Sequence, residues 1–379
     1  MNLRSESYNE ETRVPKMDFG TPFEDAIRRD LTINSLFYNL HNGQIEDLTG
    51  FGLEDLKNGI IRTPLPPIQT FLDDPLRVLR VVRFASRFGY TLWPDIAKAA
   101  SMQSIKDAFM RKISRERVGV EIEKMMKGRD AAGAIKIFHS VGYLPIIFTP
   151  PDNSVEIDMV SAVNASSLLQ FLLQEKSIPW IGNLLQDDQL FKHLYLACAI
   201  STFRSVTYVY KRKTISAVRF IVLESLKLST NDANVVEALL VDHQDISKLV
   251  KELSMDINPS TKETRVAIGA LIIKLGLKLG EMWPMSLLMA MIIESLSSKD
   301  SAAIAKRYNA FFDRVGVSGL MNCWKMKPLL DGKEIAGLLG IKPGPGIGVH
   351  IHSLIILQLQ NPALTSDDAI AYLAKQRTF

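Results

Sequence analysis

Apolar residues recur at intervals of three and four positions through most of the chain, and this spacing predicts helices that bury one face. The pattern starts after a proline-rich connector, PLPPIQTF at residues 64–71, and continues almost to the C-terminus. The clearest segments are ISRERVGVEIEKMMKG (113–128), AAGAIKIFHSVG (131–142), VVEALLVDHQDISKLVKEL (235–253), RVAIGALIIKLGLKLG (265–280) and DAIAYLAKQ (368–376). No repeat of fixed length stands out, so we expect a long array of dissimilar helices.

The residues before the connector follow a different pattern. β-branched and aromatic residues flank an Asn42-Gly43 turn, which predicts a hairpin with strands at about residues 31–40 and 44–48. Two shorter elements are expected next, a helix at FGLEDLKNG (51–59) and a strand at IIRT (60–63). The chain as a whole therefore predicts a mainly α fold, in which a small α/β piece precedes an all-helical array.

Composition and charge narrow the class of protein. The chain has 379 residues, 47% of them hydrophobic and 23% charged, which is globular composition with material for more than one domain. A net charge of +4 is only mildly basic, so any contact with nucleic acid must depend on local clusters. MWPMSLLMAMII, at 282–293, is too short to span a membrane and predicts a buried helix. Cys198 and Cys323 cannot form a disulfide framework and fit a reducing, intracellular compartment.

Common metal and phosphate motifs are missing from the sequence. No CxxC or HExxH spacing occurs, and His350 with His352 gives too few ligands for a metal site. KPGPGIG, at 342–348, lacks the Lys-Ser ending of a phosphate-binding loop, so we expect a turn between helices.

Arginines form a regular series in TFLDDPLRVLRVVRFASRFGY, at residues 70–90. They are Arg77, Arg80, Arg83 and Arg87, and this spacing places them on one face of a helix. Asp74 is a good N-cap residue and Pro75 suits the first helical position. Spacing alone leaves two interpretations open: Asp74 caps a solvated basic helix, or Asp74 and the arginines bind a ligand.

The residue types favour recognition of a base. A carboxylate at Asp74 accepts from an exocyclic amine, and the guanidinium of Arg77, one turn away, donates to ring nitrogens and carbonyl oxygens. Cytosine and adenine both present an amine beside an acceptor. Uracil and guanine present a carbonyl and an N–H in those places, so the same pair would reject them.

A second cluster lies in RRDLTINSLFYN, where Arg28, Arg29, Asp30 and Asn34 stand at a junction between a helix and a strand. Arginine binds phosphate with two parallel hydrogen bonds, and Asp or Asn can bind a ribose hydroxyl. An exposed charged turn, in which Asp30 caps the next element, remains the alternative.

Three long segments resemble one family. FGTPFEDAIRRDLTINSLFYN (19–39), IEDLTGFGLEDLKNGIIRTPLPPIQTFLDDPLRVLRVVRFASRFGY (45–90) and ISRERVGVEIEKMM (113–126) are similar to the class II tRNA nucleotidyltransferases, the CCA-adding enzymes, of eukaryotic type. The likeness is dense over residues 1–130 and looser beyond, where LLDGKEIAGLLGIKPGPGIG (329–348) resembles the family's tail.

The resemblance implies a fold and an activity. It implies a part of a polymerase-beta-like nucleotidyltransferase head at 1–66, a neck at 67–130, a helical body at 131–260 and a helical tail at 261–379. It implies addition of C, C and A to the 3′ end of tRNA from CTP and ATP without a nucleic-acid template, with the acceptor arm of tRNA as the partner.

The resemblance also implies roles for single residues. The nucleotide-binding residues would be Arg28, Arg29, Asp30, Asn34, Asp74, Arg77 and Arg80, with Asp74 and Arg77 reading the base. Asp73 and Arg83 would support this template pair, and Asp73 stands where many relatives have glutamate. Asp47, Gly50 and Arg62 would belong to a hinge, and Ser114 to Lys124 would brace the neck helices.

One motif of the family is absent from this sequence. It is a glycine-rich strand and turn followed by an Asp-x-Asp pair, whose carboxylates hold two Mg²⁺ ions in the family. The nearest acidic pairs, Glu24-Asp25 and Glu46-Asp47, do not follow a glycine-rich loop. The start MNLRSESY resembles a strand that comes after this motif, so we expect an N-terminally truncated chain without metal ligands.

Three functions stay open at this point. The first is CCA addition, the second a catalytically inactive tRNA-binding fragment, and the third a poly(A)-polymerase-like enzyme of the same superfamily. Incorporation of CTP separates the first from the third, and the missing carboxylates favour the second for this chain alone.

Two further expectations concern the partner and the compartment. The basic segment YKRKTISAVRF places Lys211, Arg212 and Lys213 where they could contact the tRNA backbone, although a solvated face explains them equally well. The start of the chain has no targeting pattern, and residues 5–25 predict a mobile polar loop. Nucleus, cytosol, mitochondrion and plastid therefore all stay open, whereas no membrane association is expected.

Overall fold

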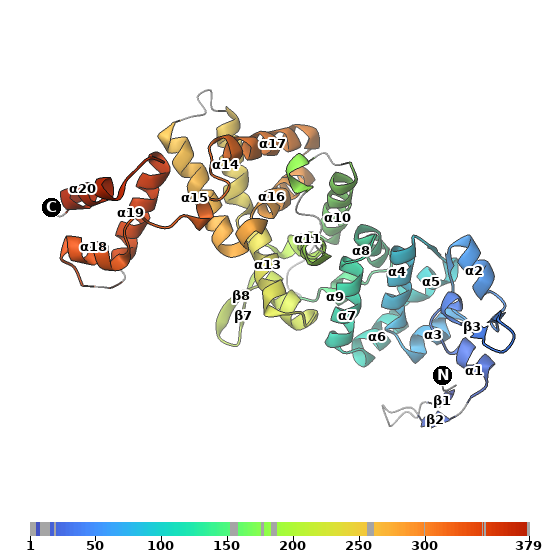
Figure 1. Cartoon of the computed structure of the whole chain (residues 1–379). Coiled ribbons are helices and arrows are strands. Elements are labelled where there is room, and N and C mark those ends of the chain that lie inside the picture. The colour runs from blue at the N-terminus through green and yellow to red at the C-terminus, as the bar shows by residue number, and fades with distance from the viewer. Residues whose placement is uncertain are drawn as a thin grey trace. The chain divides into compact units, whose positions relative to one another are not determined.

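The computed structural model describes residues 5–7, 16–18, 20–151, 158–175, 178–182, 188–255, 261–298, 300–342, 344 and 346–376. These residues are mainly helical, as predicted (Figure 1). The chain divides into two compact units. Unit 1 comprises residues 1–171 and 187–236, and unit 2 comprises 172–186 and 237–379. The division into head, neck, body and tail remains a prediction.

The strands of the described residues form four two-stranded pairs, all in unit 1. They are β1 Ser5–Ser7 with β2 Lys16–Asp18, β3 Leu36–Asn39 with β4 Gln44–Asp47, β5 Ile60–Ile61 with β6 Thr91–Leu92, and β7 Thr207–Tyr210 with β8 Lys213–Ser216. The β5–β6 pair is parallel and the other three are antiparallel.

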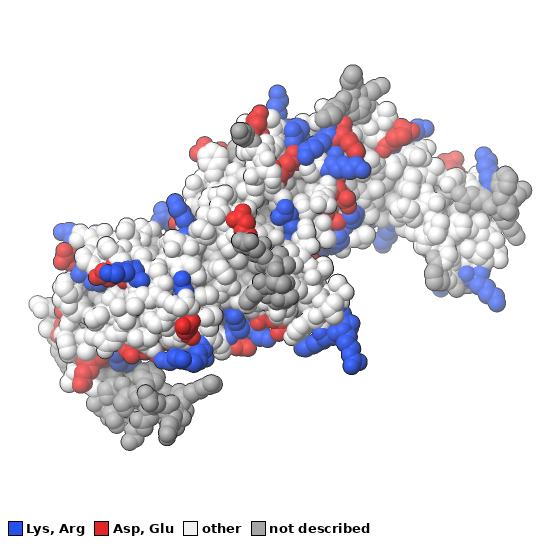
Figure 2. Space-filling view, turned by 180° about the vertical axis from the view of Figure 1, so that it is seen from behind, with Lys and Arg blue, Asp and Glu red and all other residues white. Residues whose placement is uncertain are grey.

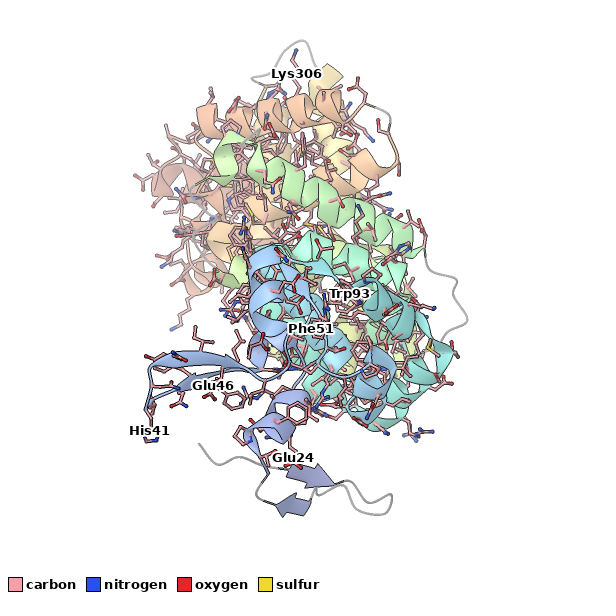
Figure 3. The ribbon with its side chains drawn as sticks, turned by 90° about the vertical axis from the view of Figure 1, so that its right-hand side faces the viewer. Glu24, His41, Glu46, Phe51, Trp93 and Lys306 are labelled. Atoms are coloured by element: carbon pink, nitrogen blue, oxygen red, sulfur yellow. The ribbon has the colours of Figure 1, made fainter. Side chains whose placement is uncertain are left out.

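The predicted Asn-Gly hairpin is present as β3 and β4, with Asn39 opposite Gln44. Figure 3 shows it standing out from the helices, with His41 near its tip and Glu46 on β4. Its first strand is shorter than predicted, because Thr32–Asn34 form a single 3₁₀ turn, η1. The N–H of Thr32 donates to the Arg62 carbonyl at 2.9 Å, so this segment bonds to the residue after β5 instead of to β4.

The helices that lie wholly in unit 1 are α1 Pro22–Ile27, α2 Gly52–Asn58, α3 Pro67–Asp73, α4 Arg77–Phe88, α5 Pro94–Ser101, α6 Gln103–Lys112, α7 Arg115–Met126, α8 Ala131–Ser140, α9 Leu144–Ile147, α11 Asp188–Ile200 and α12 Ala217–Phe220. Two helices cross the division between the units, α10 Met159–Gln174 and α13 Thr230–Val241. The predicted loop at residues 5–25 is partly wrong, because α1 begins inside it with a capping box of Thr21 and Glu24. Residues 8–15 of that loop lie outside the described part of the chain.

Helix α4 is the centre of the predicted arginine series. It packs against α7 and α8 through an apolar face that includes Val78, Leu79, Val81 and Val82, each at most 2% exposed. Burial of a side chain of this size contributes roughly 1.5–3 kcal/mol, so this face fixes the helix firmly. The helix begins at Arg77, two residues later than predicted.

Helix α7 packs closely against the end of a neighbouring segment, at Gly119. A Cβ atom at this position would lie 1.7 Å from the Leu226 carbonyl oxygen, so only glycine allows the contact. The motif expected to brace the neck helices therefore contains a glycine that packing requires.

Unit 2 is helical in all its described regular elements. They are α14 His243–Met255, α15 Lys262–Leu279, α16 Pro284–Leu296, α17 Ser301–Val317, α18 Gly332–Leu339, α19 Ile347–Gln360 and α20 Ser366–Gln376. Helix α16 is buried nearly along its whole length, which confirms the prediction for 282–293. Helices α18, α19 and α20 share a small core that includes Leu330, Ile335, Leu354 and Leu373. Among the described helices, none is long and apolar enough to cross a membrane.

Candidate nucleotide-binding site

The two arginines at the end of α1 are held by one buried carboxylate. Asp25 is 3% exposed and accepts from Arg28 Nε at 2.8 Å and from Arg29 Nη2 at 2.7 Å. Burial alone would raise the pKa of Asp25, but the hydrogen bonds from Arg29 and Arg28 outweigh burial and lower it. Arg28 and Arg29 therefore form a rigid basic edge beside β3, where the Arg29 guanidinium lies 4.7 Å from the centre of the Phe37 ring.

The structure brings Asp30, Asn34 and Arg80 together, although Arg80 lies 50 residues away in sequence from Asp30. Asp30 Oδ2 accepts from Arg80 Nε at 2.7 Å, and Asp30 Oδ1 accepts from Asn34 Nδ2 at 3.1 Å. Asp30 is 7% exposed, so its charge needs such partners. Helix α4 is thereby linked directly to the segment that follows α1.

Arg77 makes a second link between the same two segments. Its Nη2 donates to the carbonyl oxygen of Arg28 at 2.6 Å. This bond uses one of the five N–H donors that a guanidinium carries. Two contacts, from Arg77 and from Arg80, thus join the start of α4 to the segment around Arg28–Asn34, and the role of these residues in binding a nucleotide stays a prediction.

Asp74 occupies a different place from the one predicted. It ends helix α3 instead of capping α4, and its Oδ1 accepts the backbone N–H of Leu76 at 3.2 Å. Its Oδ2 accepts from Arg117 Nη2 on α7 at 2.9 Å. The side chains of Asp74 and Arg77 therefore do not pair with each other, and each is oriented by a separate partner.

The two residues expected to support this pair differ from each other. Arg83 is buried and its Nε donates to Glu121 Oε2 on α7 at 2.5 Å, so it fixes α4 against α7. Its guanidinium also lies 4.3 Å from the centre of the Phe84 ring. Asp73 is exposed at the end of α3 and makes no hydrogen bond or ion pair with the residues that the structure describes.

The expected hinge residues form a network around α2. Asp47 Oδ2 accepts the N–H of Leu53 at 3.0 Å, and its Oδ1 accepts that of Gly50, whose φ of +73° requires glycine. Burial would raise the pKa of Asp47, but these bonds and those from Thr49 lower it. Asp47 therefore anchors the start of α2.

Arg62 contacts α2 through Asp55. Its Nη2 lies 3.2 Å from Oδ1 of the fully buried Asp55. Its guanidinium also lies between the rings of Phe51 and Trp93, 4.5 and 3.9 Å from their centres. Figure 3 labels both aromatic residues on this part of unit 1.

The described carboxylates do not fit a two-metal site. Glu24 accepts from Thr21, Glu46 accepts from Asn39, and Asp25 and Asp47 have the structural partners given above. In the described part of the chain, no group of three or more His, Cys, Asp or Glu side chains could hold a metal ion. No step of a reaction can therefore be assigned to a metal held by these residues.

The basic residues of the β7–β8 hairpin lie at its two-residue turn. Lys211 and Arg212 have φ angles of 50° and 65°, and Lys213 starts β8. All three are exposed. On the face drawn in Figure 2, Lys and Arg side chains lie in small groups among Asp and Glu, so basic charge is local and not spread over the surface.

Sequence reasoning missed three residues that position the site. Asp25 holds Arg28 and Arg29, Arg117 holds Asp74, and Glu121 holds Arg83. The signal for Arg117 and Glu121 was their place in the SRERVGVEIEK motif, but nothing in their spacing shows which arginine or aspartate they meet.

Comparison with known proteins gives one consistent family. Residues 1–62 match the Poly A polymerase head domain. The chain is 36% identical to the mitochondrial CCA tRNA nucleotidyltransferase of Saccharomyces cerevisiae, over 98% of this chain and 72% of that protein. It is 34% identical to tRNA nucleotidyltransferase cca2 of Schizosaccharomyces pombe, over 98% and 75% of the two chains.

A solved structure agrees with these relatives. The Bacillus stearothermophilus CCA-adding enzyme in complex with CTP superposes with a TM-score of 0.57, covering 96% of this chain and 76% of the other. Its sequence is 19% identical, so this likeness shows the fold alone.

Proposed function

Since this chain belongs to the class II CCA-adding enzymes, the CCA tRNA nucleotidyltransferases, we propose that its site reads the base of CTP or ATP for addition to the 3′ end of tRNA. The observation that carries the proposal is the joining of two distant segments by Arg77 to the Arg28 carbonyl and by Arg80 to Asp30. These contacts place groups suited to the base beside groups suited to phosphate.

Base reading is assigned to Asp74 and Arg77. The side chain of Asp74 is 28% exposed, and a carboxylate with two bonds in place can still accept from an exocyclic amine. Arg77 has N–H donors beyond the one bound to Arg28, and these suit the N3 and O2 atoms of cytosine or N1 of adenine. Arg117 and the Arg28 carbonyl keep the two groups in place, which lowers the entropic cost of binding the base.

The triphosphate and ribose are assigned to the segment after α1. The side chains of Arg28 and Arg29 are 32% and 23% exposed, and Asp25 fixes their direction. Asp30 and Asn34 offer a carboxylate and an amide to a ribose hydroxyl. Lys211, Arg212 and Lys213 are assigned to the tRNA backbone, because they are exposed cations at one turn and can contact phosphates of any sequence.

We further infer that this chain alone binds tRNA and nucleotide but does not join them. In the family, Mg²⁺ held by carboxylates activates the attacking hydroxyl and neutralises the triphosphate. Among the described residues, no group of three or more His, Cys, Asp or Glu side chains could hold a metal ion, and the acidic pairs Glu24-Asp25 and Glu46-Asp47 are bound to protein partners.

A reducing compartment suits this protein, since Cys198 and Cys323 are buried and not joined in a disulfide.

The test uses this chain, a tRNA that lacks its terminal CCA, labelled CTP or ATP, and Mg²⁺. A gel-shift on the same samples measures tRNA binding, and a tRNA with a complete CCA end is the matched control. We expect binding without incorporation. Incorporation of CTP would show that other carboxylates hold the metals, incorporation of ATP alone would indicate a poly(A)-type enzyme, and failure to bind tRNA would overturn the proposed function.

A further inference from the structure

A basic pocket lies where α4 and α7 end, away from the residues assigned to the nucleotide. Its volume is about 400 Å³. Five of its lining residues are basic: Arg83, Arg87, Lys124, Lys127 and Arg129. The other lining residues are Ser86, Met125 and Gly128, so the pocket has no carboxylate and no aromatic ring in its lining. We call it the α4–α7 pocket.

Two of the five basic side chains form close ion pairs with carboxylates, and the other three do not. Arg83 pairs with Glu121, and Lys127 Nζ lies 2.9 Å from Glu123 Oε1. The nearest described carboxylate oxygen to Lys124 Nζ, on Glu121, is 3.8 Å away. Arg87 and Arg129 donate to no acceptor among the described residues. The pocket thus keeps three positive groups available at its edge.

The position of these residues does not follow from helix stability alone. Basic residues in the last turn of a helix interact favourably with its negative end, by roughly 0.3–1 kcal/mol. That effect accounts for Arg87 near the end of α4 and Lys124 near the end of α7. It does not account for Arg129, which follows α7, or for the hollow that the five side chains share.

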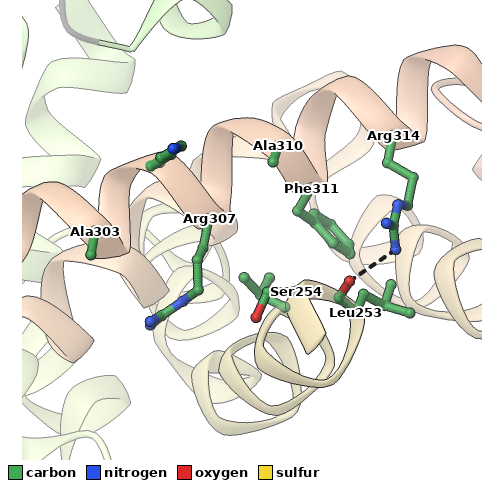
Figure 4. Close-up of a pocket in the computed structure, with 9 residues that line it drawn as sticks. Leu253, Ser254, Ala303, Arg307, Ala310, Phe311 and Arg314 are labelled. Atoms are coloured by element: carbon green, nitrogen blue, oxygen red, sulfur yellow. Dashed lines mark hydrogen bonds between the residues drawn. The ribbon is translucent and has the colours of Figure 1, made fainter. Parts of the chain in front are cut away.

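A pocket in unit 2 gives the contrast (Figure 4). It lies between α14 and α17 and is also lined by arginines. There Arg307 is paired with Glu294, and Arg314 Nη1 donates to the Leu253 carbonyl at 3.1 Å. Its arginines therefore serve the packing of the helices, with Ala310 and Phe311 beside them, whereas those at the α4–α7 pocket remain available to an anion.

We propose that the α4–α7 pocket binds phosphodiester groups of the tRNA backbone, an assignment that rests on the proposed function. A lining that has charge but neither a carboxylate nor a ring can recognise phosphate without reading a base. Arg77 and Arg87 are ten residues apart on one helix, about 15 Å at 1.5 Å per residue. Along the axis of a nucleic-acid duplex, that distance corresponds to about four or five base-pair steps at roughly 3.4 Å each. The pocket would thus hold the acceptor arm while its 3′ end reaches Arg77.

The test measures tRNA affinity against salt concentration by fluorescence anisotropy, for the whole chain and a triple variant, Arg87→Gln/Lys124→Gln/Arg129→Gln. Each phosphate contact contributes about 0.7–0.9 to the slope of log K against log salt, so the slope should become shallower by about 2–3. Because log K changes by the slope multiplied by log salt, the affinity at about 0.1 M salt should fall about 100- to 1,000-fold if the two proteins bind equally at about 1 M salt. An unchanged slope and affinity would overturn the assignment.

Two control variants distinguish binding in the pocket from a general loss of positive charge. Lys98→Gln/Arg111→Gln/Lys136→Gln removes three cations of unit 1 outside the pocket, and an equal loss with this variant would overturn the pocket as a specific site. Arg87→Lys/Lys124→Arg/Arg129→Lys keeps the charge and should keep the affinity. If the triple Gln variant fails to fold by circular dichroism, Arg129→Gln alone should still reduce the slope by about 0.7–0.9.

Two further outcomes are distinguishable. If the unaltered chain does not bind tRNA, the proposed function fails. The other outcome is that the unaltered chain binds tRNA, and the triple Gln variant binds tRNA equally well but binds inorganic pyrophosphate more weakly. The pocket would then take a small anion, and the backbone assignment would be wrong.

Discussion

Helix α4 and the β7–β8 hairpin both carry closely spaced basic residues, but the two regions use them in opposite ways. On α4, Arg77, Arg80 and Arg83 each donate to an acceptor on another segment. On the hairpin, Lys211 and Arg212 are exposed and occupy left-handed backbone conformations that usually favour Gly or Asn. Neither donates to an acceptor among the described residues.

The difference separates two kinds of recognition. Arginines held by protein partners have fixed directions, which selection of one base requires. Cations that are exposed at a turn act through charge, which suits a phosphate backbone of any sequence.

The largest effect is expected from removing Glu121, because this tests whether the arginines of α4 are held by protein partners. Glu121→Ala leaves Arg83 buried without its partner, and the free energy of unfolding should fall by about 3–5 kcal/mol. Urea unfolding measures this change. Glu116→Ala, on the exposed face of the same helix, is the control and should leave the urea midpoint nearly unchanged. Equal effects would show that the pair does not fix α4.

Arg77→Ala tests whether α4 binds nucleotide. It should weaken binding of both CTP and ATP about 10- to 100-fold, because a hydrogen bond to a charged group contributes about 1.5–3 kcal/mol. Equilibrium dialysis with labelled nucleotides measures the loss, and Arg111→Ala is the control. Unchanged binding of both nucleotides would remove Arg77 from the site.

Asp74→Ala separates base selection from a structural role of Asp74 in the turn between α3 and α4. The preference for CTP over UTP should fall about tenfold or more, since the acceptor for the exocyclic amine is lost. Stability should change by about 1 kcal/mol or less, because the pair with Arg117 is partly exposed. Competition dialysis of CTP against UTP measures the first effect and thermal melting the second. A lower melting temperature with unchanged selectivity would leave Asp74 a structural residue.

In the β7–β8 hairpin, substitution of the basic turn residues should raise stability, whereas the substitution at Glu121 lowers it. Lys211→Asn/Arg212→Gly suits the turn and should raise the free energy of unfolding by about 1 kcal/mol while it weakens tRNA binding severalfold. Lys213→Ala is the matched comparison, because Lys213 lies in β8 and its loss should weaken binding without raising stability. Gel-shift titration measures tRNA binding and thermal melting measures stability. If the double variant is more stable but binds tRNA as before, the turn takes no part in recognition.

Much of the fold could be predicted from periodicity, whereas the partners of the site residues could not. The three-four spacing gave α4 and α7, the apolar run at 282–293 gave the buried α16, and the Asn42-Gly43 pair gave the β3–β4 hairpin. The start of α4 was misplaced, since Asp74 and Pro75 have good capping character but lie in the turn after α3. Asp74 still makes a local bond there, because its Oδ1 accepts the N–H of Leu76, while its Oδ2 accepts from Arg117, 43 residues away in sequence.

The site shows the same limit. Helical spacing predicts that Arg77, Arg80 and Arg83 lie near one another on the helix surface, yet they meet the Arg28 carbonyl, Asp30 and Glu121. Which side chain lies opposite each arginine depends on how α1 and α7 pack on α4. Tertiary contacts of this kind leave no periodic signal in the sequence.

The most direct test of base reading by protein side chains is equilibrium dialysis of this chain against CTP, ATP, UTP and GTP, each labelled, under one set of conditions. The account predicts that CTP and ATP bind and that UTP and GTP bind at least about tenfold more weakly, because their carbonyl and N–H groups meet Asp74 and Arg77 in the wrong order. Equal binding of all four nucleotides would contradict it.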